Sequence, residues 1–162
     1  MKRILGLAFS LVILTTLIAF VQAPDTVGYK CMIQLTNYEG EGAYVVVSVV
    51  DKEGKYVETL YVQGDDEEWY RDLTAWWKNL YGVKRPTLDG IVGETVTGGQ
   101  RKMTVLQIPS DKIDTGFKLR FESAVEDHEY YKDDVEFDLT TENLATKKEG
   151  KGYIRYVRMI KQ

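Results

Sequence analysis

Apolar and polar residues alternate along much of the chain, which is the period expected of β-strands. Seven segments follow this pattern or consist largely of β-branched residues, and turn signals separate them. The predicted strands cover residues 29–36, 43–50, 56–62, 102–108, 117–123, 135–139 and 152–161. The run at 43–50 is almost wholly apolar, so we expect it to be central and buried on both faces.

The segment FKLRFES at residues 117–123 shows the clearest alternation. Phe117, Leu119 and Phe121 fall on one side of the predicted strand. The residues on the other side are polar, namely Lys118, Arg120 and Glu122. This is the pattern of a half-buried antiparallel strand, with its polar side toward solvent.

Between the third and fourth predicted strands the period changes to that of a helix. The apolar stripe recurs at intervals of four, three and four residues and consists of Trp69, Leu73, Trp76 and Leu80, widened by Trp77 and Tyr81. Asp65 or Asp66 can cap its start, and Gly82 with Pro86 ends it. We predict one amphipathic helix at about residues 67–81 that covers the open side of a sheet. A ligand platform of exposed aromatic rings is the alternative.

Together these elements predict a mainly β fold, an immunoglobulin-like antiparallel β-sandwich with one inserted helix. The prediction depends on strand count and patterning, because the cysteine and tryptophan spacing of antibody domains is missing. Cys31 is the only cysteine, so no internal disulfide can form, and we expect a buried strand thiol.

The first 23 residues have the form of a signal peptide, with Lys2 and Arg3 before an apolar run from Ile4 to Val21. A retained membrane anchor is the alternative, because this run is about long enough to span a bilayer. Either reading places the β-sandwich domain, residues 24–162, in the periplasm or otherwise outside the cytoplasm. No further membrane span is expected after the leader.

The charge of the chain excludes some partners. The sequence has 21 basic and 25 acidic residues, a net charge of −4, and loss of Lys2 and Arg3 lowers it to −6. A domain with this acidic balance lacks the excess of basic residues that binding to nucleic acid phosphates needs. Basic residues gather near the C-terminal end, at Lys147, Lys148, Lys151, Arg155, Arg158 and Lys161. They predict a patch that steers a protein partner, or ordinary surface solvation.

Residue types suited to catalysis or metal binding are scarce. His128 is the only histidine, so the sequence supports neither a hydrolytic triad nor a zinc site, and we expect no catalytic residue and no metal site. The acidic run around it favours a solvated hairpin connection over a calcium site, because it lacks the spacing of a calcium loop. The run contains Glu126, Asp127, Glu129, Asp133 and Asp134.

The stretch LDGIVGETVTGG at residues 88–99 is the most unusual part of the sequence. On one reading, Asp89 and Gly90 form a tight turn, and Gly98 and Gly99 form a flexible connector into the next strand. On the other reading, the stretch presents a threonine hydroxyl for chemistry, since glycine lets the backbone approach a large planar substrate.

The order of parts resembles a family of predicted periplasmic domains of unknown function that occur near PepSY-type membrane proteins and flavin transferases. The shared parts are a leader, a strand pair, the Trp-containing helix WYRDLTAWW, and an Asp-to-Gly motif with a following Gly pair. The resemblance covers roughly residues 29–139.

This resemblance implies a possible cofactor site. The family motif is similar to the site at which a flavin transferase attaches FMN to a threonine, and Asp89, Gly93 and Thr95 stand at its spacing. The chain departs from the motif at Val92, where Ser or Thr is expected, and at Glu94, where Ala is expected. The Glu94 side chain would crowd the acceptor hydroxyl, and its charge would repel a phosphate diester.

The expected function is therefore that of an exported, non-enzymatic accessory or binding protein without a cofactor. The resemblance implies a membrane-associated redox or metal-uptake system and a membrane-associated or periplasmic protein partner. The binding surface would be the loop from Thr87 to Gln100 with any exposed helix aromatics. The alternatives are an electron-transfer protein with FMN on Thr95 and a sugar- or peptide-binding module.

Overall fold

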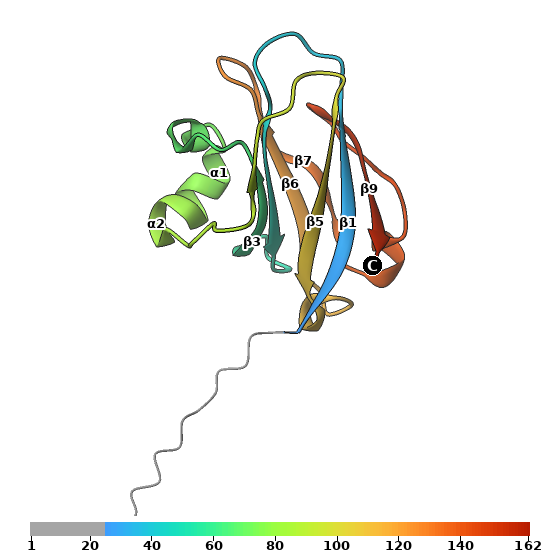
Figure 1. Cartoon of the computed structure of the whole chain (residues 1–162). Coiled ribbons are helices and arrows are strands. Elements are labelled where there is room, and N and C mark those ends of the chain that lie inside the picture. Colours follow the sequence, from blue (N-terminus) through green and yellow to red (C-terminus); the bar gives the residue numbers. More distant parts are fainter. Residues whose placement is uncertain (1–24) are drawn as a thin grey trace, which may run out of the picture.

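The computed structural model describes residues 25–162, which form two β-sheets and a helical segment (Figure 1). The first sheet has four strands in the order β5-β1-β9-β8. Its strands are β1 (Thr26–Leu35), β5 (Arg101–Pro109), β9 (Ile154–Lys161) and the short β8 (Lys148–Glu149). All pairs within this sheet are antiparallel.

The second sheet has five strands in the order β4-β3-β2-β6-β7. Its strands are β2 (Tyr44–Val50), β3 (Tyr56–Gln63), β6 (Lys118–Ala124), β7 (Tyr130–Asp138) and the two-residue β4 (Val92–Gly93). The β4 strand pairs with β3 in parallel, whereas the other pairs are antiparallel. Every residue of β2 is buried, as its β-branched run predicts.

The main core lies between the two sheets. It combines Ile33 and Leu106 from the first sheet with Val47, Leu119 and Phe121 from the second. Cys31 is fully buried on β1, which confirms the expected strand thiol, and burial raises its pKa to about 12. The two-layer β-sandwich is therefore confirmed, while its immunoglobulin-like detail stays a prediction.

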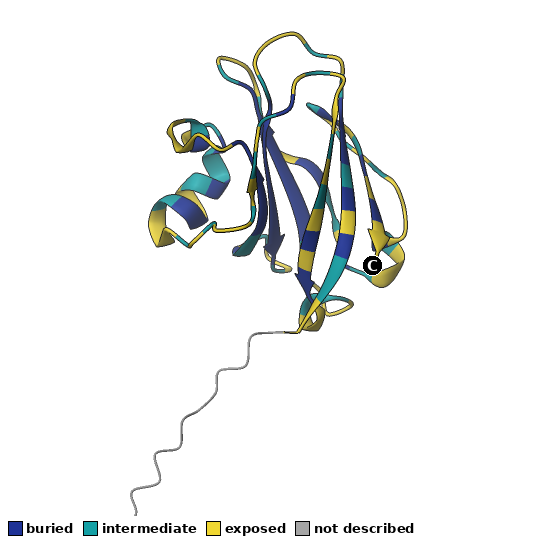
Figure 2. Ribbon diagram, in the orientation of Figure 1, coloured by how far each residue is buried: buried dark blue, intermediate teal, exposed yellow. Residues whose placement is uncertain are grey.

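A helical segment, residues 67–84, covers the outer face of the five-stranded sheet (Figures 1 and 2). It consists of the 3₁₀ turn η1 (Glu67–Arg71), α1 (Thr74–Trp76), the π-turn η2 (Trp77–Tyr81) and α2 (Gly82–Lys84). Its apolar side forms a second core with Val46, Val50 and Val62 of the sheet. The predicted covering role is thus confirmed, although the segment is not one regular α-helix.

The interruption of the helical segment has a local cause. Leu73 leaves helical geometry at ψ 62°, and it supplies no side-chain cap for α1. The N–H of Thr74 donates to the Asp72 carbonyl, and those of Ala75 and Trp76 donate to side chains of the sheet. Because the sheet satisfies these donors, the first turn does not need to continue regularly from η1.

Smaller elements complete the described chain. The loop after β5 contains the 3₁₀ turn η3 (Ser110–Lys112), and α3 (Thr141–Leu144) follows β7. The predicted leader and the alternative of a retained anchor concern residues 1–23, which lie outside the described residues. Within residues 25–162, no helix is both long and apolar enough to cross a membrane.

Candidate functional site

Asp89, Gly93 and Thr95 lie along one extended passage between the helical segment and β5, but they do not converge on one point. Asp89 is exposed and forms a turn with Gly90, whose φ is +76°. Gly93 lies in β4 beside Gln63 of β3. Thr95 is half-buried, just before the bridge that joins Val96 to Ala43. The predicted tight turn is present, while the three residues do not form one pocket.

Gly93 has a packing role that its place in the motif did not reveal. A Cβ at this position would lie 2.5 Å from the hydroxyl oxygen of Tyr61, which is buried on β3. Any side chain would therefore force either β4 or the Tyr61 ring to shift. The glycine leaves room for the Tyr61 hydroxyl, which accounts for this residue without a ligand.

Thr95 fits a covalent flavin poorly in this arrangement. A Cβ built on Gly42 would lie 2.6 Å from both Cβ and Oγ1 of Thr95, so the hydroxyl packs against the Gly42 backbone. Glu94 beside it is exposed and carries the charge that disfavours an incoming phosphate. Both features oppose the approach of a bulky, anionic flavin phosphate to Thr95.

The Gly98-Gly99 pair forms a hydrogen-bonded turn that leads into β5, as the connector reading places it. A Cβ on Gly98 would lie 2.2 Å from the carbonyl oxygen of Tyr38, and Gly99 has a φ of +77°. The Gly99 N–H donates to the Thr36 carbonyl, and the Gln34 amide donates to the Gly99 carbonyl at 2.9 Å. The glycines are needed for close approach and backbone handedness.

A groove of about 440 Å³ lies between the helical segment and the passage after it. Three carboxylates reach it, from Asp65, Glu67 and Asp89, and none of them forms an ion pair within residues 25–162. Tyr70 and Tyr81 form the aromatic part of its lining, with ring centroids 5.4 Å apart. The groove therefore places three carboxylates beside a largely buried aromatic wall, and its negative charge favours a cationic ligand.

The two groove tyrosines stay protonated at physiological pH. Burial, followed by the Tyr81 hydroxyl and the nearby acidic groups, raises the pKa of Tyr70 to about 12. Burial, followed by the neighbouring Glu67, also raises the pKa of Tyr81. The negative charge of the groove thus comes from its carboxylates, while the tyrosine rings are largely buried against Trp76 and form the apolar wall.

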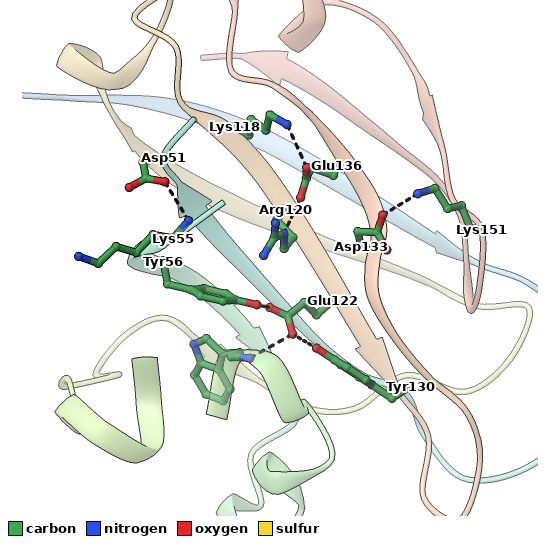
Figure 3. A network of polar contacts seen from close by, with 11 residues as sticks. Asp51, Lys55, Tyr56, Lys118, Arg120, Glu122, Tyr130, Asp133, Glu136 and Lys151 are labelled. Carbon is green, nitrogen blue, oxygen red and sulfur yellow. Dashed lines mark hydrogen bonds and ion pairs between the residues drawn. The ribbon is translucent and has the colours of Figure 1, made fainter. Parts of the chain in front are cut away.

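Beneath the helical segment, β6 holds a fully buried carboxylate, Glu122 (Figure 3). Its oxygens accept hydrogen bonds from the hydroxyls of Tyr56 on β3 and Tyr130 on β7. A third bond comes from the Trp76 N–H at 3.2 Å, and the Tyr130 oxygen in turn accepts the Ala75 N–H at 3.0 Å. Glu122 on β6 thereby connects β3, β7 and α1 through one buried carboxylate.

Glu122 has no ion-pair partner among the described residues. Arg120, two positions earlier on β6, donates to Glu136 of β7 at 2.5 Å instead and stacks over the Tyr56 ring. Burial therefore dominates and raises the pKa of Glu122 to about 7, although its hydrogen bonds and the Arg120 charge partly offset this. Burial and the Glu122 charge also raise the pKa of Tyr56 and of Tyr130.

The prediction that the polar side of β6 faces solvent is wrong for Arg120 and Glu122. Glu122 is 0% exposed because it lies beneath the helical segment, and Arg120 is 5% exposed because it packs against the Tyr56 ring and Glu136. Strand alternation locates only the sides of a strand and does not say what covers them. A signal did exist in the sequence, since an apolar helical stripe needs a second sheet face on which to pack.

The acidic run near His128 matches the predicted connection only in part. Among the described residues, no group of three or more His, Cys, Asp or Glu side chains is placed to hold a metal ion. Asp134, in contrast, is buried and accepts bonds from the Ser123 hydroxyl and from the N–H groups of Lys151, Gly152 and Ile154. It fixes the turn before β9 to the five-stranded sheet, a role that the sequence analysis missed.

The fold and the groove define a mainly β, two-layer domain with a helical cover. The chain belongs to the family described as "Predicted periplasmic protein (DUF2271)", whose model matches residues 26–156. This description agrees with the location predicted from the leader. Comparison with curated proteins and with solved structures gave no match.

Proposed function

We propose that the protein is an exported, non-enzymatic accessory protein that binds a basic segment of a periplasmic or membrane-associated partner in the groove. The observation that carries this proposal is the set of three groove carboxylates, Asp65, Glu67 and Asp89, which form no ion pair within residues 25–162. A lysine or arginine side chain matches the carboxylates through charge and charge-assisted hydrogen bonds, and its aliphatic part can lie along the apolar wall of the groove. The redox or metal-uptake setting follows from the family resemblance alone.

The state of Glu122 supports binding over catalysis. A buried carboxylate with a pKa near 7 is often a general acid or base. Here, however, the group is 0% exposed, and its oxygens already accept three hydrogen bonds within the fold. A substrate has no route to it while the helical segment is in place, so we assign it a structural role.

The test uses arginine methyl ester and spermidine as cationic probes and glutamate as the anionic counter-probe, followed by NMR chemical shifts and calorimetry. We expect both cations to bind and glutamate not to bind. The variant Glu67→Gln with Asp89→Asn should lower the affinity for the cations about tenfold, because it removes two charges from the groove. The control variant Glu39→Gln with Glu53→Gln changes the net charge equally at exposed sites elsewhere. Equal losses in both variants, or no binding at all, would contradict the proposal.

The alternative is an electron-transfer protein with FMN attached to Thr95. In its favour, the Thr95 hydroxyl takes part in no hydrogen bond among the described side chains, and the residue is not fully buried. Co-expression with a flavin transferase from the same source should then produce a yellow protein. Mass spectrometry would locate the added mass on the Thr95 peptide in the wild type and not in Thr95→Val. A colourless protein with an unmodified peptide excludes this alternative.

A further inference from the structure

The outer face of the four-stranded sheet is uncovered, unlike the outer face of the five-stranded sheet. Met103 and Val105 on β5 are 44% and 43% exposed, and Ile160 on β9 is 55% exposed. Figure 2 shows exposed and buried positions alternating along β1 and β5, with no element of the described chain over their outward side. Large apolar side chains gathered on one open sheet face mark an interaction surface.

Strand register places these side chains in two adjacent rows. Met103, Met32 and Arg158 form one row across β5, β1 and β9, and Val105, Lys30 and Ile160 form the other. We call these six residues the basic apolar face. Cross-strand neighbours on one side of a sheet lie about 5 Å apart, so the six side chains form one continuous surface.

The charge of this face contrasts with that of the whole chain. Its two cations, Lys30 and Arg158, are exposed and form no ion pair among residues 25–162. The next row adds Arg101 opposite Gln34. The carboxylate at the margin, Glu149, is paired with Lys147 at 3.0 Å. In a chain with net charge −4, this face is therefore positive and apolar.

A hollow at the edge of the face offers a place for an anchoring side chain. It measures about 410 Å³ and is lined by Met32, Arg158, Tyr156, Ala145 and Lys147. Methionine, tyrosine and arginine are the residue types enriched at protein interfaces, and a hollow of this kind takes the central side chain of a partner. The face thus has an apolar centre, basic groups beside it and a hollow for an anchor.

We propose that the basic apolar face docks a second protein, whose complementary surface has carboxylates around an apolar centre. This site is additional to the groove, which lies by the helical segment on the far side of the sandwich (Figure 1). The protein then contacts two partners of opposite charge, one at each side. Charge complementarity accelerates and orients the docking, while the apolar centre supplies affinity.

Two other occupants fit this face less well. A symmetric pair of two copies would bring Lys30 and Arg158 against their own counterparts, which costs like-charge repulsion. An anionic lipid surface would repel the remainder of the chain, which has more acidic than basic residues. A protein surface can instead place carboxylates only where the cations lie.

The test places a photo-crosslinking amino acid at Val105 in the full chain, expressed in its source cells. The crosslinked protein is identified by mass spectrometry, purified, and its affinity for the unmodified chain is measured. We expect an acidic partner whose binding weakens with added salt. Lys30→Glu with Arg158→Glu should lower the affinity at least about tenfold, and Glu→Lys changes at the crosslinked site of the partner should restore it.

The control variant is Lys78→Glu with Lys84→Glu, which reverses two exposed charges on the helical segment and should bind as the wild type does. A thermal melt of each variant checks that the fold is retained. Crosslinking to another copy of this chain, to no protein, or binding to phosphatidylglycerol vesicles in its place would overturn the proposal. Binding of cationic probes in the groove should not change in Lys30→Glu with Arg158→Glu, so failure of one proposal is distinguishable from failure of the other.

Discussion

At the scale of single residues, Glu122 is the most unusual group in the described chain. A carboxylate without a cationic partner is costly to bury in its charged form, and here the hydrogen bonds from two tyrosines and one backbone N–H do not fully offset that cost. Its pKa of about 7 means that it changes charge within the range of ordinary buffers. The protein therefore has a titrating group in its interior.

The first prediction concerns stability and pH. The pKa of Glu122 is about 7 in the folded chain and near 4.5 when unfolded, so the folded state binds the proton more tightly. The stabilising contribution of protonated Glu122 is then fully present below pH 4.5 and is lost as the pH rises through 7. From pH 5.5 to pH 8, we expect this group to lower the free energy of unfolding by about 2 kcal/mol. Urea denaturation at the two pH values should show this loss in the wild type and not in Glu122→Gln. A variant with the same pH dependence as the wild type would contradict the assignment.

The second prediction concerns the tyrosine that serves both Glu122 and the helical segment. Tyr130→Phe removes the donor to Glu122 and also leaves the Ala75 N–H without its acceptor. We expect a loss of about 1–3 kcal/mol in the free energy of unfolding, because two buried polar groups lose a partner. Tyr131→Phe is the matched control, since its hydroxyl donates to Glu129 at the surface. Equal small losses in both variants would argue against a buried network.

At the scale of elements, the contact between β4 and β3 explains a glycine that the sequence motif assigned to a cofactor. The third prediction is that Gly93→Ala lowers the free energy of unfolding by about 1–3 kcal/mol through its clash with the Tyr61 hydroxyl. In a Tyr61→Phe background, the loss of unfolding free energy caused by Gly93→Ala should be smaller by on the order of 1 kcal/mol. Thermal or urea denaturation of the four proteins gives the coupling energy.

Gly90→Ala is the control for this cycle. A Cβ on Gly90 would meet nothing within 4 Å, but the backbone has a φ of +76°. The change should lower the free energy of unfolding by about 1 kcal/mol through backbone strain alone. This loss should be the same whether residue 61 is tyrosine or phenylalanine. If Gly93→Ala behaved in this independent way as well, the packing account of Gly93 would be wrong.

At the scale of the whole molecule, the two cores share the five-stranded sheet. One core fills the space between the sheets, and the other joins the same strands to the helical segment. The β2 strand contributes alternate residues to both, as Val45 and Val47 belong to the first core and Val46 and Val50 to the second. Loss of either core would expose β2, so the two layers should be stable only together.

The fourth prediction follows from this shared strand. All three tryptophans, Trp69, Trp76 and Trp77, lie in the helical segment, so tryptophan fluorescence reports on that segment alone. Far-ultraviolet circular dichroism reports mainly on the sheets. We expect the two urea unfolding curves to coincide in midpoint and slope, as for a single cooperative transition. A fluorescence midpoint at clearly lower urea would show that the helical segment separates first.

Much of the fold could be predicted from local pattern. The seven strands appear close to their predicted positions, the apolar side of β6 faces the core, and the Trp-rich stretch is the helical cover. Residue period decides these features, because it determines which side chains share a side of a strand or helix. The candidate site was harder to predict. Asp89 reaches the groove as part of the expected loop, but its companions Asp65 and Glu67 come from the start of the helical segment.

The sequence by itself determined the strand and helix types, the single buried thiol, the acidic balance and the leader pattern. These follow from residue order and composition. Only the tertiary structure decided that Glu122 is buried, that Gly93 is packed against Tyr61, and that Met32, Met103 and Ile160 share one open face. The physical reason is that burial, pKa and surface patches depend on which elements pack together, and those contacts join residues far apart in the chain.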